Sequence, residues 1–204
     1  MKAIAMFNNK GGVGKTTVLC NLASWLSLNE HKKVLVIDAD PQCNTTTYVL
    51  DDDEFLNVYY EKNTFTLNDI ILPLKTRGAY IEKEKIEVVK SKGFGFDVVA
   101  GSPKLASSED FLSGDWKDIK AQEIRGIRSN MLFFDLLRKC DEYDFVFFDM
   151  GPSLGAINRA ILLACAYFIT PMSSDLFSIL ALENIGSSLS EWKMTFNKVL
   201  ANLN

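Results

Sequence analysis

The sequence predicts an α/β fold in which helices cover both faces of a doubly wound, mostly parallel sheet. Two observations lead to this prediction: short apolar runs recur along the chain, and longer segments with helical periodicity separate them. Continuous apolar runs are typical of parallel strands that are buried on both faces. The predicted strands are residues 3–7, 34–37, 97–100, 145–148 and 167–171.

The helical pattern is clearest in segments 16–28 and 130–139, where apolar residues recur at intervals of three and four. The stretch TLNDIILP predicts a further short helix that ends at Pro73. An amphipathic helix closes the chain, and we expect its apolar face to pack in the core. That face carries Leu189, Trp192, Phe196, Val199 and Leu203.

Three segments are less regular. Residues 51–64 open with four acidic residues, which predicts a solvated loop. Residues 81–99 alternate charges and contain KGFG, which predicts an exposed hairpin with its turn at these glycines. Residues 102–128 carry a proline and two glycines between polar stretches, and we expect them to form an irregular excursion.

The bulk composition is that of one globular domain. The chain has 204 residues, of which 48% are hydrophobic, enough for a single well-buried core. Its most apolar stretch, 160–169, is about half as long as the roughly 20 residues that span a membrane, so we expect a cytoplasmic protein. The net charge of −4 does not support direct binding to DNA. The four cysteines form no C-x-x-C pair, which argues against a zinc or iron–sulfur site.

The stretch NNKGGVGKTT, residues 8–17, lies between a predicted strand and a predicted helix, which is the context of a phosphate-binding loop. Its glycines allow the backbone to turn N–H groups inward, and the helix adds the positive end of its dipole. We expect Lys15 to reach the β- and γ-phosphates and the Thr16 hydroxyl to ligate Mg²⁺. The residues expected to bind nucleotide are Lys10, Gly11, Gly12, Val13, Gly14, Lys15, Thr16 and Thr17.

The loop departs from the general pattern G-x-x-x-x-G-K-[ST] because Asn9 replaces a glycine and Lys10 adds a second lysine. With this lysine, KGGVGKTT resembles the deviant phosphate loop of the ParA/MinD family of P-loop ATPases. The resemblance extends from residue 1 to about 185 and is loose over 50–128. It implies a homodimer on ATP binding, in which Lys15 acts in its own subunit and Lys10 reaches the phosphates of the partner.

Two carboxylates follow the second predicted strand in KKVLVIDADPQCNTT. Asp38 and Asp40 stand where open α/β sheets place ligand contacts, and one intervening residue points them to opposite sides of an extended chain. We therefore expect them to have different tasks. The segment resembles the family's switch DxDPQ(G)N, which implies that Asp40 orients or deprotonates the attacking water and that Asp38 holds the metal through its water shell. Cys43 stands where the family most often has glycine, which predicts a stiffer turn.

A third carboxylate, Asp149, follows four apolar residues in YDFVFFDMGPSLG, as a Walker B aspartate does. We expect it to hold Mg²⁺ directly or through water. Gly151 replaces the first proline of the family's segment, which predicts a looser switch. Pro171 and Asp175 match the family's next strand end and loop, and either a purely structural role or a place near the nucleotide or dimer contact stays open for them.

The resemblance implies a Mg·ATP-dependent, dimerising ATPase that hydrolyses ATP slowly and positions DNA, a plasmid or chromosome, or another cargo. It also implies a stimulating partner of the ParB kind. Members of the family ordinarily continue further, so residues 1–204 are expected to be one P-loop ATPase domain that lacks their usual C-terminal part and its adenine contacts.

Two alternatives stay open. The last helix has the place of a MinD-like membrane-binding helix, but its polar face carries too few cations for an anionic membrane, so we expect it to pack in the core and do not expect membrane association. A small-molecule synthetase of the same superfamily is the other alternative. Turnover of ATP that depends on a small substrate would identify it.

Overall fold

A computed structural model describes residues 1–61, 65–77, 86–120, 124–172 and 174–201. Its strands form one sheet in the order β3-β4-β2-β5-β1-β6, and every pairing is parallel except β3 with β4. The predicted doubly wound, mostly parallel sheet is therefore confirmed. The strands are β1 Lys2–Met6, β2 Val34–Asp38, β3 Val89–Lys90, β4 Asp97–Val99, β5 Phe145–Asp149 and β6 Tyr167–Ile169.

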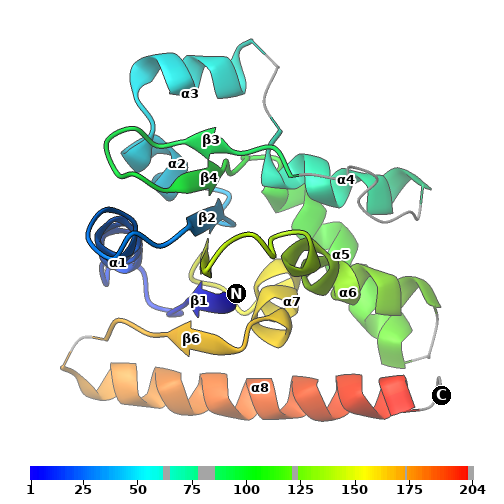
Figure 1. Ribbon diagram of the computed structural model, residues 1–204. Coiled ribbons are helices and arrows are strands. Elements are labelled where there is room, and N and C mark those ends of the chain that lie inside the picture. Colours follow the sequence, from blue (N-terminus) through cyan, green and yellow to red (C-terminus); the bar gives the residue numbers. More distant parts are fainter. Residues whose placement is uncertain (62–64, 78–85, 121–123, 173, 202–204) are drawn as a thin grey trace.

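Helices cover both faces of this sheet. Figure 1 places α1 on one side of the strands and α5, α6 and α7 on the other. The helices are α1 Lys15–Leu28, α2 Asn44–Val49, α3 Asp52–Tyr59, α4 Leu67–Arg77, α5 Leu105–Lys120, α6 Ile124–Arg138, α7 Ala156–Ala164 and α8 Leu176–Ala201.

Strand β5 explains why the predicted strands are continuously apolar. Its successive side chains point to opposite faces, so Phe147 packs in the cluster under α1 with Leu19, whereas Phe148 packs in the cluster on the other face. There its ring meets Phe133 of α6 edge-on, with the ring centres 5.8 Å apart. Burying each phenylalanine contributes roughly 1.5–3 kcal/mol, so a polar residue in place of either would destabilise the fold.

Residues 51–64 contain a helix, so the predicted loop is wrong. The acidic residues begin α3: the Asp51 carboxylate accepts from the Glu54 N–H at 2.8 Å, and the Glu54 carboxylate accepts from the Asp51 N–H at 3.1 Å. This capping box satisfies two N–H groups, and acids are favoured at a helix N-terminus. These acidic residues therefore form the N-terminal cap and first turn of a helix.

Helix α4 runs on through Pro73, so the predicted end at this proline is also wrong. Proline removes one hydrogen bond of the helix. The buried side chains of Ile70, Ile71 and Leu74, the last of them beyond the proline, offset this loss. Burial by the rest of the fold therefore overrides the local signal.

The hairpin is confirmed for the residues that the structure describes, but its predicted exposure is wrong: Phe96 and Val98 are buried, because β4 pairs with β2 inside the sheet. Strands β3 and β4 are antiparallel, and the Ser91 N–H donates to the Phe96 carbonyl at 3.0 Å across the KGFG turn. The charged residues 81–85 lie outside the described ranges.

Segment 102–128 is not irregular, because most of it lies in α5 and in the first turns of α6. Helix α5 buries Leu105, Leu112 and Ile119, seven residues apart, along one face. The glycines at 114 and 126 lie inside helices, where an isolated glycine is tolerated. The apolar spacing, and not the glycines, therefore determines the structure of this segment.

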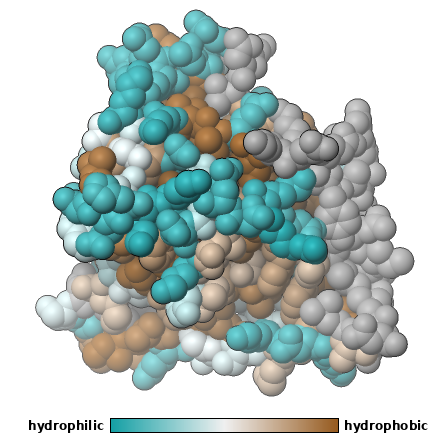
Figure 2. All heavy atoms as spheres, viewed as in Figure 1, coloured by the Kyte–Doolittle hydropathy of each residue, from teal (hydrophilic) through white to brown (hydrophobic). Residues whose placement is uncertain are grey.

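The last helix, α8, packs against α7 and α5. Trp192, Phe196 and Val199 are buried, which confirms the predicted packing face; Leu203 lies outside the described residues. None of the helices that the structure describes is both long enough and apolar enough to cross a membrane. Figure 2 shows apolar residues gathered at its lower left, over β6 and the first turns of α8. The exposed apolar residues there are Tyr167, Phe168, Met172, Leu176, Ile179, Leu180 and Leu182.

Candidate functional site

The predicted site residues meet at the C-terminal ends of three neighbouring strands. In the sheet register, Asp149 at the end of β5 lies between Met6 of β1 and Asp38 of β2. The phosphate loop follows β1, so it is brought beside both carboxylates. This is the edge at which open α/β sheets bind ligands.

The loop has the backbone that its glycines predict. Gly12 and Gly14 adopt φ values of 72° and 82°, a left-handed conformation that side chains rarely adopt. Helix α1 begins at Lys15, and no side chain caps its N-terminus. Its first N–H groups are thus left for a ligand, and an anion is the ligand that they favour.

Asn8, which the motif does not include, holds the base of this loop. Its buried side chain donates to the Pro171 carbonyl at 2.7 Å and accepts from the Lys10 N–H at 2.9 Å. Asparagine side chains commonly form a hydrogen bond with the backbone two residues further on. An asparagine directly after the first predicted strand could therefore have indicated this turn. Pro171 thereby has a structural contact to the loop.

Asp149 is buried, and its two oxygens differ. Oδ2 accepts hydrogen bonds from the Thr16 hydroxyl at 2.7 Å and from the Thr45 hydroxyl at 2.6 Å. Oδ1 is buried without a hydrogen-bond partner. Burial, and to a lesser extent the nearby Asp40, raise the pKa of this carboxyl, whereas the two hydroxyls and Lys15 counteract the rise.

These residues fit a magnesium ion. A buried carboxylate oxygen without a partner is costly, and the other oxygen of the same carboxylate accepts from the Thr16 hydroxyl. The described parts of the chain contain no group of three or more His, Cys, Asp or Glu residues that could hold a metal ion by themselves. Mg²⁺ commonly takes only one or two carboxylates and completes its shell with phosphates and water, and Asp149 would supply one such carboxylate.

Asp38 is fully buried, and its carboxylate is occupied by the protein. Oδ2 accepts from the Thr46 N–H at 2.8 Å and from the Thr46 hydroxyl at 2.7 Å, and Oδ1 accepts from the Asp40 N–H at 3.3 Å. Burial raises the pKa of Asp38 to about 7, although the bonds from Thr46 lower it. Gly101 lies so close that a Cβ there would be 2.9 Å from the Asp38 Cγ. The role of Asp38 in holding the metal stays a prediction.

Asp40 lies on the other side of the chain, at the turn into α2. Its carboxylate accepts from the Gln42 N–H at 2.9 Å and lies against Gly151, where a Cβ would be 3.4 Å from the Asp40 Cγ. Cys43 caps α2 with φ 53° and ψ 36°. This left-handed conformation favours glycine, the residue that the resemblance leads us to expect at this position.

The two lysines of the loop have different surroundings. Lys15 is close enough to Asp149 to affect its pKa. The Lys10 ammonium instead lies 2.9 Å from the Asp175 carboxylate, and both side chains are partly exposed. Within one chain, therefore, Lys10 contacts the segment between β6 and α8.

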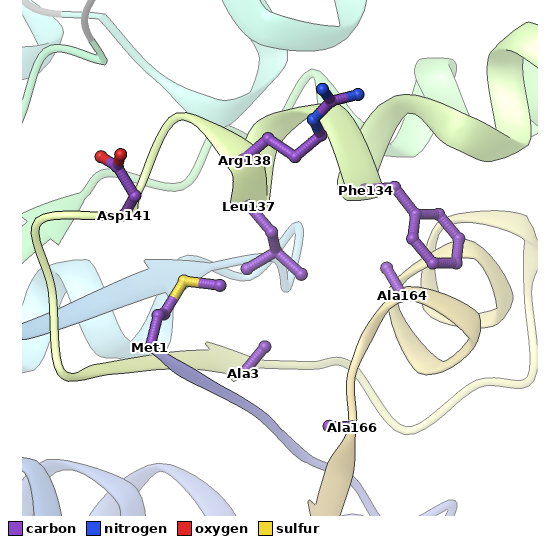
Figure 3. A pocket seen from close by; sticks show the side chains of 8 residues that line it. All are labelled: Met1, Ala3, Phe134, Leu137, Arg138, Asp141, Ala164 and Ala166. Atoms are coloured by element: carbon purple, nitrogen blue, oxygen red, sulfur yellow. The ribbon is translucent and has the colours of Figure 1, made fainter.

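A cavity of about 530 Å³ lies at the opposite end of the sheet, beside the start of β1. In Figure 3 its apolar side chains, including Met1, Leu137 and Phe134, face a common space, while the charged ends of Arg138 and Asp141 point away from Met1. It contains none of the predicted site residues. The chemistry gathers at the phosphate-loop edge, away from this apolar hollow.

Comparison with known proteins agrees with this geometry. The AAA_31 family model, described as an AAA domain, matches residues 1–202. A virulence plasmid ParA family protein, pGP5-D of Chlamydia psittaci, is 34% identical over 188 residues, which are 91% of this chain and 62% of that protein. The chromosome-partitioning ATPase Soj of Thermus thermophilus is 28% identical over 204 residues, covering 100% of this chain and 65% of that protein.

Among solved structures, protein DIP2308 of Corynebacterium diphtheriae is similar with a TM-score of 0.90 and 35% identity, covering 98% of this chain and 70% of that one. The chain thus spans slightly less than two thirds of the length of the relatives pGP5-D and Soj. Because the family model covers nearly the whole chain and the relative pGP5-D is a ParA family protein, the chain belongs to the AAA_31 family, among the P-loop ATPases of the ParA/MinD type.

Proposed function

We propose that the protein binds Mg·ATP at the phosphate loop, dimerises around two nucleotides and hydrolyses ATP slowly, so that the nucleotide state acts as a switch. The observation that carries this proposal is Asp149, whose buried Oδ1 has no partner while its Oδ2 accepts from the hydroxyl of Thr16. In this proposal Thr16 and Asp149 hold Mg²⁺, which neutralises charge on the phosphates. Asp38 acts through the metal's water shell, a role that its present contacts do not require.

Each remaining residue then has a task. The N–H groups of the loop, including those of Gly11, Val13 and Thr17, surround the phosphates. Lys15 stabilises negative charge in its own subunit, and Asp40 orients or deprotonates the attacking water.

Lys10 would act in the partner's site. In one chain it pairs with Asp175, and the partner's phosphates would have to replace this carboxylate. A pair between partly exposed side chains contributes at most about 1 kcal/mol. The exchange is therefore inexpensive compared with contact to a polyphosphate.

The cargo is proposed from the relatives. One is named a virulence plasmid ParA family protein and another a chromosome-partitioning ATPase. We propose that this chain likewise serves DNA partition, with a ParB-like protein that stimulates hydrolysis. The acidic net charge of −4 favours contact with DNA through such a partner.

The test is sedimentation and light scattering of wild type, Lys10→Ala, Lys15→Ala and Asp40→Ala, with and without ATP and Mg²⁺. We expect Lys15→Ala to lose nucleotide binding, Lys10→Ala to bind nucleotide without dimerising, and Asp40→Ala to accumulate as an ATP dimer. Lys193→Ala, which removes an exposed lysine of α8, is the matched control and should behave as wild type. A wild type that hydrolyses ATP normally while remaining monomeric at saturating ATP would contradict the dimer mechanism.

A further inference from the structure

Thr45 is a buried threonine in the first turn of α2, directly after the segment DADPQCN, and none of the roles assigned above to the site residues is carried by it. Its hydroxyl donates to Asp149 Oδ2 at 2.6 Å, across 104 residues of sequence. A hydroxyl bond to a carboxylate of this length is charge-assisted and stronger than one between neutral groups. The contact joins the segment after β2, which carries Asp40, to the carboxylate that ends β5.

The bond also decides how the carboxylate is turned. Thr16 and Thr45 both donate to Oδ2, so this oxygen is held from two different helices while Oδ1 has no partner. A carboxylate fixed at one oxygen by two donors cannot rotate freely about its last bond. The free oxygen therefore keeps one direction, and a ligand of Asp149 meets it already oriented.

We propose that Thr45 is a positioning residue of the magnesium site: through Oδ2 it holds Asp149 so that Oδ1 is presented to the metal of Mg·ATP. This inference rests on the proposed function, because it assigns a further residue to the same site. Residues behind a metal ligand commonly change metal affinity by 10- to 100-fold. Thr45 also makes the metal ligand sensitive to the position of the Asp40 segment.

A purely structural role predicts a different outcome. Valine has nearly the shape of threonine and is easier to bury than an unpaired hydroxyl, so a packing residue at 45 would accept Thr45→Val without effect on magnesium. Serine keeps the hydroxyl and removes the methyl group. The two substitutions therefore separate hydrogen bonding from packing.

The experiment titrates Mg²⁺ against the binding of a fluorescent ATP analogue to wild type, Thr45→Val and Thr45→Ser, with binding in EDTA measured in parallel. We expect Thr45→Val to raise the half-saturating Mg²⁺ concentration about 10-fold, with binding in EDTA unchanged, and Thr45→Ser to remain within about two-fold of wild type. Thr47→Val is the control, because the Thr47 hydroxyl donates only to the Cys43 carbonyl among the bonds described for it. It should titrate as wild type.

Thermal melting establishes that each variant is folded; if Thr45→Val is not, Thr45→Ala is compared with Thr45→Ser in its place. A half-saturating Mg²⁺ concentration unchanged in a folded variant without the hydroxyl would overturn the inference about Thr45 and leave the proposed function standing. Equal loss in the valine and serine variants would also overturn it. A wild type that binds no nucleotide would overturn both.

Discussion

Asp149 and Asp38 end neighbouring strands, are partners in the sheet register and are both buried, yet their carboxylates have different surroundings. Asp149 leaves one oxygen without a partner. Asp38 bonds the N–H and hydroxyl of Thr46 through Oδ2 and accepts from the Asp40 N–H through Oδ1. Asp149 is thus open to a ligand, whereas the protein itself occupies the carboxylate of Asp38 on the neighbouring strand.

The comparison teaches that burial alone does not identify a metal ligand. Burial raises the pKa of both carboxyls, so the pKa direction does not distinguish them. The hydrogen-bond partners do. An unpartnered buried oxygen costs about 1–3 kcal/mol, and a bound cation would relieve this cost at Asp149, whereas Asp38 has no such cost to relieve.

The largest expected effect is that of Asp149→Asn. The amide keeps the shape of the carboxylate but removes the charge that we expect to hold Mg²⁺, so ATP hydrolysis should fall on the order of 100-fold or more. Phosphate release at saturating Mg·ATP measures this, and thermal melting should show a protein at least as stable as wild type, because a buried charge has been removed. Hydrolysis by Asp149→Asn at the wild-type rate would contradict the inference that Asp149, unlike Asp38, is open to a metal.

Asp38→Asn should act on stability, and its effect should depend on pH. Because the folded-state pKa of about 7 lies above the ordinary aspartate value of 3.8, the folded chain binds the proton more tightly than the unfolded chain. Wild type therefore loses stability as pH rises from about 4 to about 7, by up to about 1.4 kcal/mol per pH unit from this group.

Urea denaturation from pH 4 to 8, without Mg²⁺ or nucleotide, checks this slope. Asp38→Asn should reduce it, and a smaller slope of the same sign should remain from Asp149, whose pKa is also raised. Parallel curves for wild type and the variant would show that Asp38 is not the group that titrates.

The smallest effect is expected from Gly101→Ala. The added Cβ would lie 2.9 Å from the Asp38 Cγ and 3.1 Å from the Cys43 Sγ, which forces buried atoms apart and costs about 1–3 kcal/mol. Gly114→Ala is the matched control, because nothing lies within 4 Å of a Cβ at that helical position. Denaturation should show Gly101→Ala destabilised and Gly114→Ala slightly stabilised; equal stability of the two variants would mean that the neighbours of Gly101 move aside at little cost.

Much of the fold and of the site could be predicted, because the signals were local. The strand, glycine loop and helix around Lys15 are contiguous, and the apolar runs mark the strands that carry Asp38 and Asp149. The errors fell where two local signals compete. Acids can mark either a solvated loop or a helix start, as at Asp51, and glycines can lie either in loops or inside a packed helix such as α5.

The sequence by itself determined the α/β class, the phosphate loop and the carboxylates at the strand ends, because each depends on residues within one short segment. Only the tertiary structure decided which oxygen of Asp149 is free, that Thr45 shares its other oxygen, and that Lys10 meets Asp175 within one chain. The physical reason is distance along the chain: these contacts join residues 104 to 165 positions apart. No local spacing encodes them, and they exist only once the parallel strands bring their C-terminal ends to one edge.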